Sequence, residues 1–274
     1  MEKKVYRLSA GKMIHEAVQN RKMIRKLAKN DFVTKYAGSY LGILWAFVQP
    51  VITILLYWFV FQVGFSTRDV GDYPFVLWLS AGMIPWFFFS DAWNGATGSL
   101  LEYSFLVKKV VFNVGILPVI KIFSAFCVTF FFHVFVIILF ALNGYVPTIH
   151  ILQIAYCMVC TIALAWGLSY FTSSVILFVR DLGHFLNVLL QVLMWMTPIM
   201  WDISMVEKYP WLVQILKLNP VFYIVQESRN ALFSEGWFWQ DPLWTVYFWG
   251  ITVLLFLAGA RVFQKLRPHF ADVM

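Results

Sequence analysis

Residues 122–179 read IFSAFCVTFFFHVFVIILFALNGYVPTIHILQIAYCMVCTIALAWGLSYFTSSVILFV, and the stretch contains no Asp, Glu, Lys or Arg. A helix needs about 20 mostly apolar residues to cross the hydrocarbon core of a bilayer, where its backbone must satisfy its own hydrogen bonds. The one interruption is NGYVPT at residues 143–148, and Asn-Gly and Pro are typical of turns. We therefore predict two membrane-spanning helices, at residues 115–142 and 149–173.

Apolar stretches of spanning length also lie on both sides of this pair. They cover residues 41–64, 74–95, 182–201 and 242–260. The whole chain is 61% hydrophobic, against roughly 45–50% in soluble domains. We therefore predict an all-α membrane protein with six transmembrane helices in residues 41–262. An N-terminal region (1–40) and a C-terminal tail (263–274) flank this domain.

The basic residues are unevenly distributed over the two sides of the predicted membrane. If the N-terminus is inside, ten of the 21 Lys and Arg residues precede Leu41, and six more lie in the inner loops and tail. The outer segments carry four bases against seven acids. Because Lys and Arg accumulate in cytoplasmic loops, we predict a plasma-membrane protein with both termini in the cytoplasm. The clustering favours contact with membrane lipids over binding of nucleic acid.

Three segments do not span. Residues 11–30 place apolar residues at helical spacing among bases, which predicts an amphipathic helix lying on the inner membrane surface. Residues 98–113 form a mixed cytoplasmic loop. The external segment 203–235 is too rich in Trp, Phe and Leu for a solvated loop, so we expect two short interfacial or re-entrant helices, at residues 205–217 and 220–233.

The second external helix has a recognisable start. Asn219 followed by Pro220 predicts an N-cap and a first-turn proline. We expect Glu227 and Arg229 to face water or the exit path. The apolar residues are expected to face lipid or the fifth span, at Val221, Ile224, Val225 and Leu232.

The sequence offers no catalytic constellation. The five His residues are scattered, and the chain has no GxSxG, HExxH or GxxxxGK[ST] motif, so we expect neither ATP hydrolysis nor a cofactor or metal on this chain. Cys157 and Cys160 form a CxxC within an apolar stretch, for which helix packing is the favoured interpretation. A stand-alone secondary transporter would need inverted repeats, and a membrane-embedded transferase a gathered set of acid-base residues. Neither pattern is visible.

Two charges lie inside the predicted spans, Asp91 and Lys121. A charge in the membrane indicates function by default. Both residues lie toward the cytoplasmic ends of their helices, however, where snorkelling or a mutual ion pair is an equally simple explanation. Structural pairing and substrate contact therefore both stay open.

Aromatic residues make up 19% of the chain. Interfacial belts and packing explain many of them, but Trp58 and Trp195 do not obviously lie at an interface, and residues 86–89 (WFFF) surround one helical turn. Aromatic faces suit sugar rings and lipid chains, so packing and a substrate path are weighed against each other. The substrate-path candidates are Trp45, Trp58, Trp86, Phe89, Asp91, Lys121 and Trp195.

Four strings resemble the type-2 ABC exporter permeases for polysaccharides. They are NDFVTKYAGSYLGILWAFVQP (30–50), PFVLWLSAGMIPWFFFSDAWNGATGSLLEYSFLVKKVVFNVGILPV (74–119), VRDLGHFLNVLLQVLMWMTPIMWD (179–202) and LNPVFYIVQESRNAL (218–232). The start of the second string is most similar to permeases that translocate teichoic acid. One departure is Asn113 after Phe112, where the family usually has Phe-Pro.

The resemblance implies a homodimer of permeases with two ATP-binding subunits docked from the cytoplasm, which would bind ATP and Mg. It implies export of undecaprenyl-diphosphate-linked wall teichoic acid in a Gram-positive bacterium, with O-antigen or capsular polysaccharide as the alternative. It also implies that the first and fifth spans line the route. The implied ATPase-coupling residues are Glu16, Arg21, Glu102, Phe105, Lys108 and Lys109. The implied external gate residues are Pro220, Phe222, Tyr223, Glu227 and Arg229.

Overall fold

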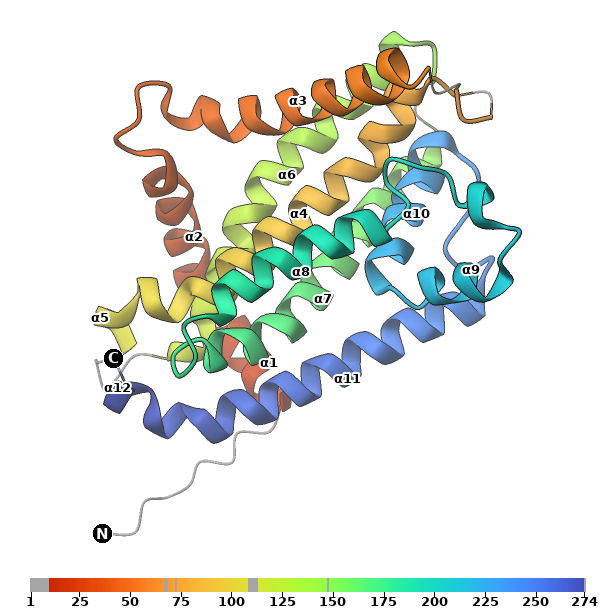
Figure 1. Ribbon diagram of the computed structural model, residues 1–274. Helices are drawn as coiled ribbons and strands as arrows, with labels where there is room; N and C mark the ends of the chain where they lie inside the picture. Colours follow the sequence, from red (N-terminus) through yellow and green to blue (C-terminus); the bar gives the residue numbers. More distant parts are fainter. Residues whose placement is uncertain (1–9, 67–68, 72, 108–112, 147, 274) are drawn as a thin grey trace.

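The structure is a computed structural model that describes residues 10–66, 69–71, 73–107, 113–146 and 148–273 (Figure 1). Five helical stretches in this part of the chain are long and apolar enough to cross a membrane, and a sixth apolar helix is shorter. All six overlap predicted spans, so the prediction of an all-α membrane protein of about six spans is confirmed. The five stretches are Gly42–Gly64, Phe75–Glu102, Val114–Leu142, Ile149–Val175 and Pro242–His269, and the sixth helix is Leu182–Met196. The second stretch continues as helix to Glu102, into the segment that we predicted to be a loop from residue 98.

The spanning stretches contain α3 (Trp45–Trp58), α4 (Phe75–Glu102), α6 (Leu117–Leu142), α7 (Gln153–Val175), α8 (Leu182–Met196) and α11 (Pro242–Leu266). The helix α4 is central, since 78% of its most apolar window is buried in the protein. In the first span the corresponding share is 11%. The helix α3 crosses one side of the bundle at an angle to α4 and α6 (Figure 1), so most of its surface must be covered by lipid or another subunit.

Two glycines allow α7 and α11 to pack closely. A Cβ at Gly167 would lie 2.9 Å from the backbone nitrogen of Phe256, and one at Gly259 would lie 3.1 Å from the backbone nitrogen of Phe171. Small residues at such crossings let two membrane helices approach along their backbones. This contact fixes the last span against the centre of the bundle.

The N-terminal segment forms two helices, α1 (Ala10–Gln19) and α2 (Arg21–Tyr36), rather than the single predicted helix. The break is at Asn20, whose side chain donates to the carbonyl of Glu16 at 2.8 Å. We predicted that the apolar face of this segment lies against the membrane, but part of that face is covered by protein. Ala17, Ile24 and Ala28 are buried in a cluster with residues of α6 and α11, because an apolar face is satisfied equally well by protein as by lipid.

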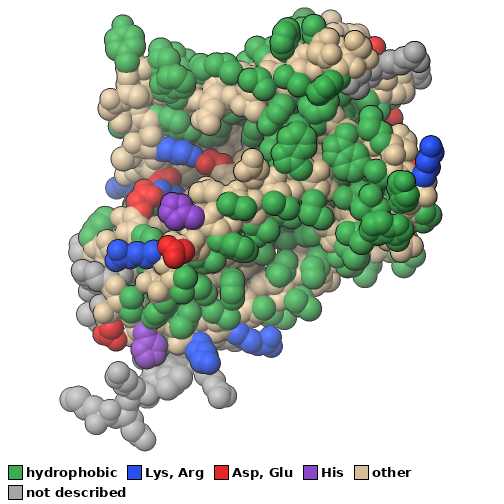
Figure 2. All heavy atoms as spheres, viewed as in Figure 1, with side chains coloured by type: hydrophobic (Ala, Val, Ile, Leu, Met, Phe, Trp, Pro, Cys, Tyr) green, Lys and Arg blue, Asp and Glu red, His purple; other side chains and the backbone are tan. Residues whose placement is uncertain are grey.

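The chain ends at the same end of the bundle as α1 and α2 (Figure 1). After α11 it forms a 3₁₀ turn, Arg267–His269, and a short helix, α12 (Phe270–Val273). Phe270 is buried against Phe263 in the cluster that holds α1. Figure 2 shows most charged side chains gathered at this end, while hydrophobic side chains cover the middle of the molecule.

The segment that we predicted to be external contains a 3₁₀ turn (Ile203–Val206), α9 (Pro210–Lys217) and α10 (Pro220–Phe233). The predicted start of α10 is confirmed: the side-chain oxygen of Asn219 accepts the backbone N–H of Val221 at 3.0 Å, and Pro220 begins the helix. The expectation that its apolar side faces lipid is wrong. The helix α10 packs against α4 and α7, and Val221, Ile224 and Val225 are buried in the protein core instead of facing lipid.

Candidate functional site

A cavity of about 500 Å³ lies between the first span and the bundle, and we call it the inner cavity. Its walls come from α3, α4, α6 and α8, with the last turn of α2 beside them. The space-filling view shows the surface hollowed between α3 and the bundle (Figure 2). Aromatic side chains line the cavity at Tyr36, Trp45, Trp86, Phe87 and Phe132. Hydroxyl and amide side chains line it at Gln49, Thr53, Ser90, Asn94, Thr129 and Gln191.

An ion pair forms part of the wall of the inner cavity. The Nζ of Lys35, in the last turn of α2, donates to the Oδ1 of Asp91 in α4 at 2.6 Å, and both side chains are half-exposed. Burial opposes the charge on Lys35, but the neighbouring Asp91 carboxylate outweighs it and raises the pKa of Lys35. The pair joins the N-terminal region to the central helix at the edge of the cavity.

The second intramembrane charge belongs to a different cluster. The Nζ of Lys121 lies 2.5 Å from the Oδ1 of Asp31 and 2.6 Å from the Oε2 of Glu102. The hydroxyl of Tyr103 donates to Asp31 at 2.8 Å, and burial, followed by this hydrogen bond, raises the pKa of Tyr103. A mutual ion pair of Asp91 and Lys121 was one of the expected possibilities, and it is wrong: each residue pairs with an opposite charge on α2.

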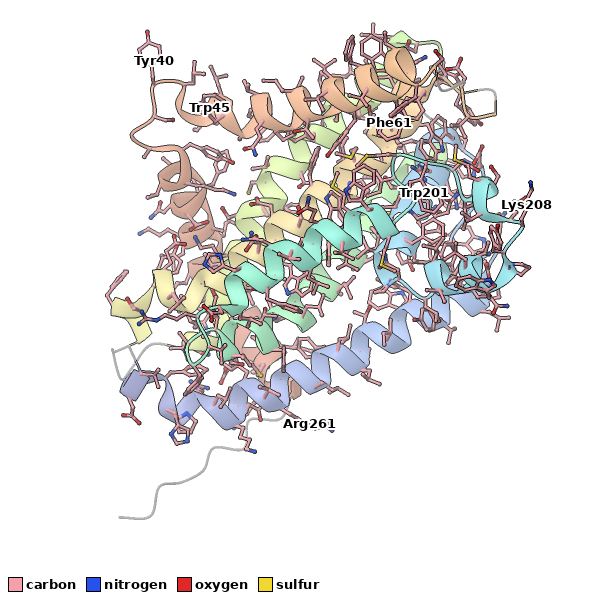
Figure 3. All side chains as sticks on the ribbon, in the orientation of Figure 1. Tyr40, Trp45, Phe61, Trp201, Lys208 and Arg261 are labelled. Carbon is pink, nitrogen blue, oxygen red and sulfur yellow. The ribbon has the colours of Figure 1, made fainter. Side chains whose placement is uncertain are left out.

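The inner cavity receives three of the seven predicted path residues, Trp45, Trp86 and Asp91. Figure 3 labels Trp45 near the start of α3, where the chain turns away from α2. The other four do not line it. Phe89 is buried in the bundle core, Lys121 lies in the α2 cluster, and Trp58 and Trp195 lie outside the lining.

Of the predicted coupling residues, two bind other side chains of the protein and two are exposed. Glu16 accepts a hydrogen bond from the side chain of Asn113 at 2.8 Å, and Glu102 is bound to Lys121. Arg21 and Phe105 are exposed, Phe105 at 59% and in a short helix, α5 (Ser104–Val107). Lys108 and Lys109 lie outside the described residues.

The predicted gate helix has its polar residues buried, which corrects the expectation that Glu227 and Arg229 face water. Glu227 is 4% exposed and accepts a hydrogen bond from the amide of Gln153 in α7 at 2.9 Å. Burial raises the pKa of Glu227 to about 7 and lowers that of Arg229 to about 9. Pro220 begins the helix, and Phe222 and Tyr223 pack against Trp244 of α11.

A contact between the central helix α4 and α10 depends on a proline in α4. Pro85 has no N–H, so the carbonyl of Ala81, four residues earlier, lacks its helical partner. The hydroxyl of Ser228 in α10 donates to that carbonyl at 3.0 Å. At the next residue of α4, a Cβ at Gly82 would lie 2.9 Å from a guanidinium nitrogen of Arg229, so glycine leaves the space that this side chain fills.

Asp31 and Lys35 complete the two charge clusters but were not among the predicted site residues. One signal was available: Asp31 is the only acid between Glu16 and Asp69, within a run of bases. An isolated acid among bases indicates a specific partner. The amide and hydroxyl residues of the inner cavity carried no comparable signal.

Comparison with known proteins identifies the family of this chain. Residues 23–233 match the family described as "ABC-2 type transporter". The chain is 23% identical over 261 residues to the "O-antigen export system permease protein RfbA" of Myxococcus xanthus, covering 95% of this chain and 98% of that protein. It is 26% identical over 253 residues to the protein of the same name from Klebsiella pneumoniae, covering 90% and 93% of the two chains. It is 25% identical over 223 residues to the "Polysialic acid transport protein KpsM" of Escherichia coli, covering 78% and 83%. The match covers most of the chain, and the structure has six apolar helices. This chain therefore belongs to the ABC-2 type transporter family.

Proposed function

We propose that the chain is the membrane subunit of an ATP-driven exporter of a lipid-linked polysaccharide, and that the inner cavity receives sugar units of the polymer. The observation that carries the proposal is the lining of that cavity. Trp45 and Trp86 offer apolar ring faces, and Gln49, Asn94 and Gln191 offer hydrogen bonds. Sugars present the same combination, with apolar ring faces and a periphery of hydroxyls.

The polymer we propose is an O-antigen or capsular polysaccharide. The relatives named above bear the names of O-antigen and polysialic acid exporters, which supports this alternative over teichoic acid. Teichoic acid, its undecaprenyl-diphosphate anchor and a Gram-positive source stay predictions from the resemblance alone.

We propose that two ATP-binding subunits dock at the end formed by α1, α2 and α5. Exposed bases of α2 and the exposed ring of Phe105 lie there, and the chain itself has no phosphate-binding loop. We further propose that a second copy of the chain covers the exposed faces of α3 and α8. Both termini would then lie in the cytoplasm.

The test is reconstitution of the permease in nanodiscs with its ATP-binding subunit. ATP hydrolysis is measured with lipid-linked O-antigen, with lipid-linked teichoic acid and without polymer. We expect O-antigen to stimulate hydrolysis in the wild-type complex. In Gln191→Leu and Trp45→Ala, the polymer concentration for half-maximal stimulation should rise about tenfold, which corresponds to a loss of about 1.4 kcal/mol of binding. Val253→Ala, on the exposed face of α11, is the matched control.

Three results would contradict the proposal or a part of it. If the rate of ATP hydrolysis were the same with and without polysaccharide, a polysaccharide substrate would be excluded. Equal responses of Gln191→Leu and Val253→Ala would remove the inner cavity from the route. Stronger stimulation by teichoic acid than by O-antigen would reverse the choice of polymer.

A further inference from the structure

A second cavity, of about 380 Å³, lies at the other end of the molecule, and we call it the outer cavity. It is bounded by the segment before α4, by the segment after α8 and by α10. Figure 3 labels Trp201 and Lys208 at this end, opposite Tyr40 and Trp45. Its lining includes Trp78, Phe222, Gln226 and Arg229, with the carboxylates of Asp202 and Glu235. None of these residues lines the inner cavity.

The guanidinium of Arg229 is held rigidly in the wall of this cavity. It is 3% exposed, its carbon Cζ lies 3.5 Å from the centre of the Trp78 ring, and its two terminal nitrogens donate to the carbonyls of Pro198 and Ile199 at 2.7 and 2.9 Å. Among the described residues, no carboxylate forms an ion pair with Arg229, and its Nε has no hydrogen-bond partner.

The two hydrogen bonds of Arg229 have a structural role, because they fix the segment after α8. This role does not account for the other polar groups around the same space. Asp202 uses one oxygen to cap the turn at Ser204, at 2.8 Å. The carboxylate of Glu235 makes no hydrogen bond with any described residue, and the amide of Gln226 makes one, to Asn230 at 3.2 Å. Acceptors on the acids and an amide thus converge on a space walled by Trp78 and Phe222.

The charges of this lining select among ligands. Among the described residues of this lining, one cation and two carboxylates give a negative balance, which disfavours a phosphate or an acidic sugar. A neutral sugar suits it, because hydroxyls donate to carboxylates and accept from an amide, and a sugar ring packs on aromatic faces. We infer that the outer cavity is a binding site for a neutral saccharide unit at the outer face of the protein. This inference rests on the proposed export of polysaccharide.

The test uses the full-length permease in nanodiscs and needs no ATP-binding subunit. Saturation-transfer NMR is recorded with maltose, lactose and N,N′-diacetylchitobiose as neutral probes, and with glucose 1-phosphate as the anionic probe. We expect transfer to at least one neutral disaccharide and weaker transfer to the phosphate. These variants are made in a Gln191→Leu background, in which sugar binding to the inner cavity is weakened. In this background Gln226→Trp, which fills the outer cavity, and Glu235→Gln, an exposed change of charge only, should each reduce the neutral signal at least fivefold.

Two further comparisons locate the binding. Trp211→Ala, added to Gln191→Leu, alters an exposed ring on α9 outside both linings and should keep the signal. Loss of the signal in Gln191→Leu itself, relative to wild type, would assign the sugar to the inner cavity and overturn the inference. So would stronger binding of glucose 1-phosphate, or equal signals with and without Glu235→Gln. Absent binding with intact polymer-stimulated hydrolysis defeats this site alone, whereas binding without any stimulation defeats the proposed function alone.

Discussion

The Nζ of Lys121 lies 2.5 Å from the Oδ1 of Asp31, a residue 90 positions earlier in the chain. Both side chains are largely buried, at 11% and 4% exposure. Asp91, the other charge of the spans, is bound instead to the half-exposed Lys35. The helix α2 is thus held by one buried and one open ion pair, and this difference can be measured.

Removing one member of the buried pair should be costly. Lys121→Met should reduce stability by about 3–5 kcal/mol, since the buried carboxylate of Asp31 is left without a cation. Asp31→Asn should cost less, because Lys121 keeps its ion pair with Glu102. The double variant should recover part of that loss. Asp91→Asn, in the open pair, should cost about 1 kcal/mol or less. Thermal unfolding of the purified permease in detergent measures all four, and Asp91→Asn combined with Lys121→Met should be additive. Coupling between the latter two would restore the pairing that we have rejected.

The hydroxyl of Ser228 should contribute to stability only while residue 85 is a proline. Ser228→Ala leaves the Ala81 carbonyl buried without a donor, which costs about 1–3 kcal/mol. Pro85→Ala supplies a backbone N–H to that carbonyl, so Ser228→Ala should be much less harmful in the Pro85→Ala background. The measurement is the unfolding temperature of the two single variants, the double variant and the wild type. Equal losses in both backgrounds would mean that the Ser228 hydroxyl does not serve Ala81.

The carboxyl of Glu227 should make stability depend on pH. Its pKa in the folded protein is about 7 because of burial, above the value of roughly 4.3 for an exposed Glu. The folded state therefore holds a proton that the unfolded state releases. The stabilisation is complete below about pH 4 and is lost as the pH rises through 7, by about 4 kcal/mol in total. Glu227→Gln, which keeps an acceptor for Gln153, should flatten this part of the profile between pH 5 and 8. An unchanged profile would assign the dependence to another group.

The close contact of α7 and α11 can be tested with two glycines of one helix. Gly259→Ala should destabilise the protein by about 1–3 kcal/mol, because the new methyl group forces the helices apart. Gly250→Ala is the matched control, since nothing lies within 4 Å of a Cβ there, and it should be neutral or stabilising by up to about 1 kcal/mol. Fluorescence-detected size exclusion after heating reports both. Equal tolerance of the two changes would contradict the close crossing.

Cysteine labelling tests the orientation and the burial of α10 together. In a background without Cys127, Cys157 and Cys160, an impermeant thiol reagent should label Lys208→Cys in intact cells. It should label Lys26→Cys only after the membrane is opened. Glu227→Cys should not be labelled from either side, because residue 227 of α10 is buried against α7. Labelling of Lys26→Cys in intact cells would invert the proposed topology.

The sequence by itself determined the six apolar helices, the start of α10 at Asn219 and Pro220, and the absence of a phosphate-binding loop. These properties are local along the chain: a helix in lipid satisfies its own backbone, and a cap bonds to residues two or three positions away. An amphipathic pattern also shows which face of α1 and α2 is apolar.

Only the tertiary structure decided what covers those faces and which charges meet. Protein and lipid are equally apolar, so hydropathy does not tell a helix such as α10, buried between α4 and α7, from one lying at the membrane surface. The partners of Asp91 and Lys121 lie 56 and 90 residues away, and their pairing follows from the approach of α2 to the bundle. Such distant pairs are fixed by the packing of whole helices, a property that no single stretch of sequence contains.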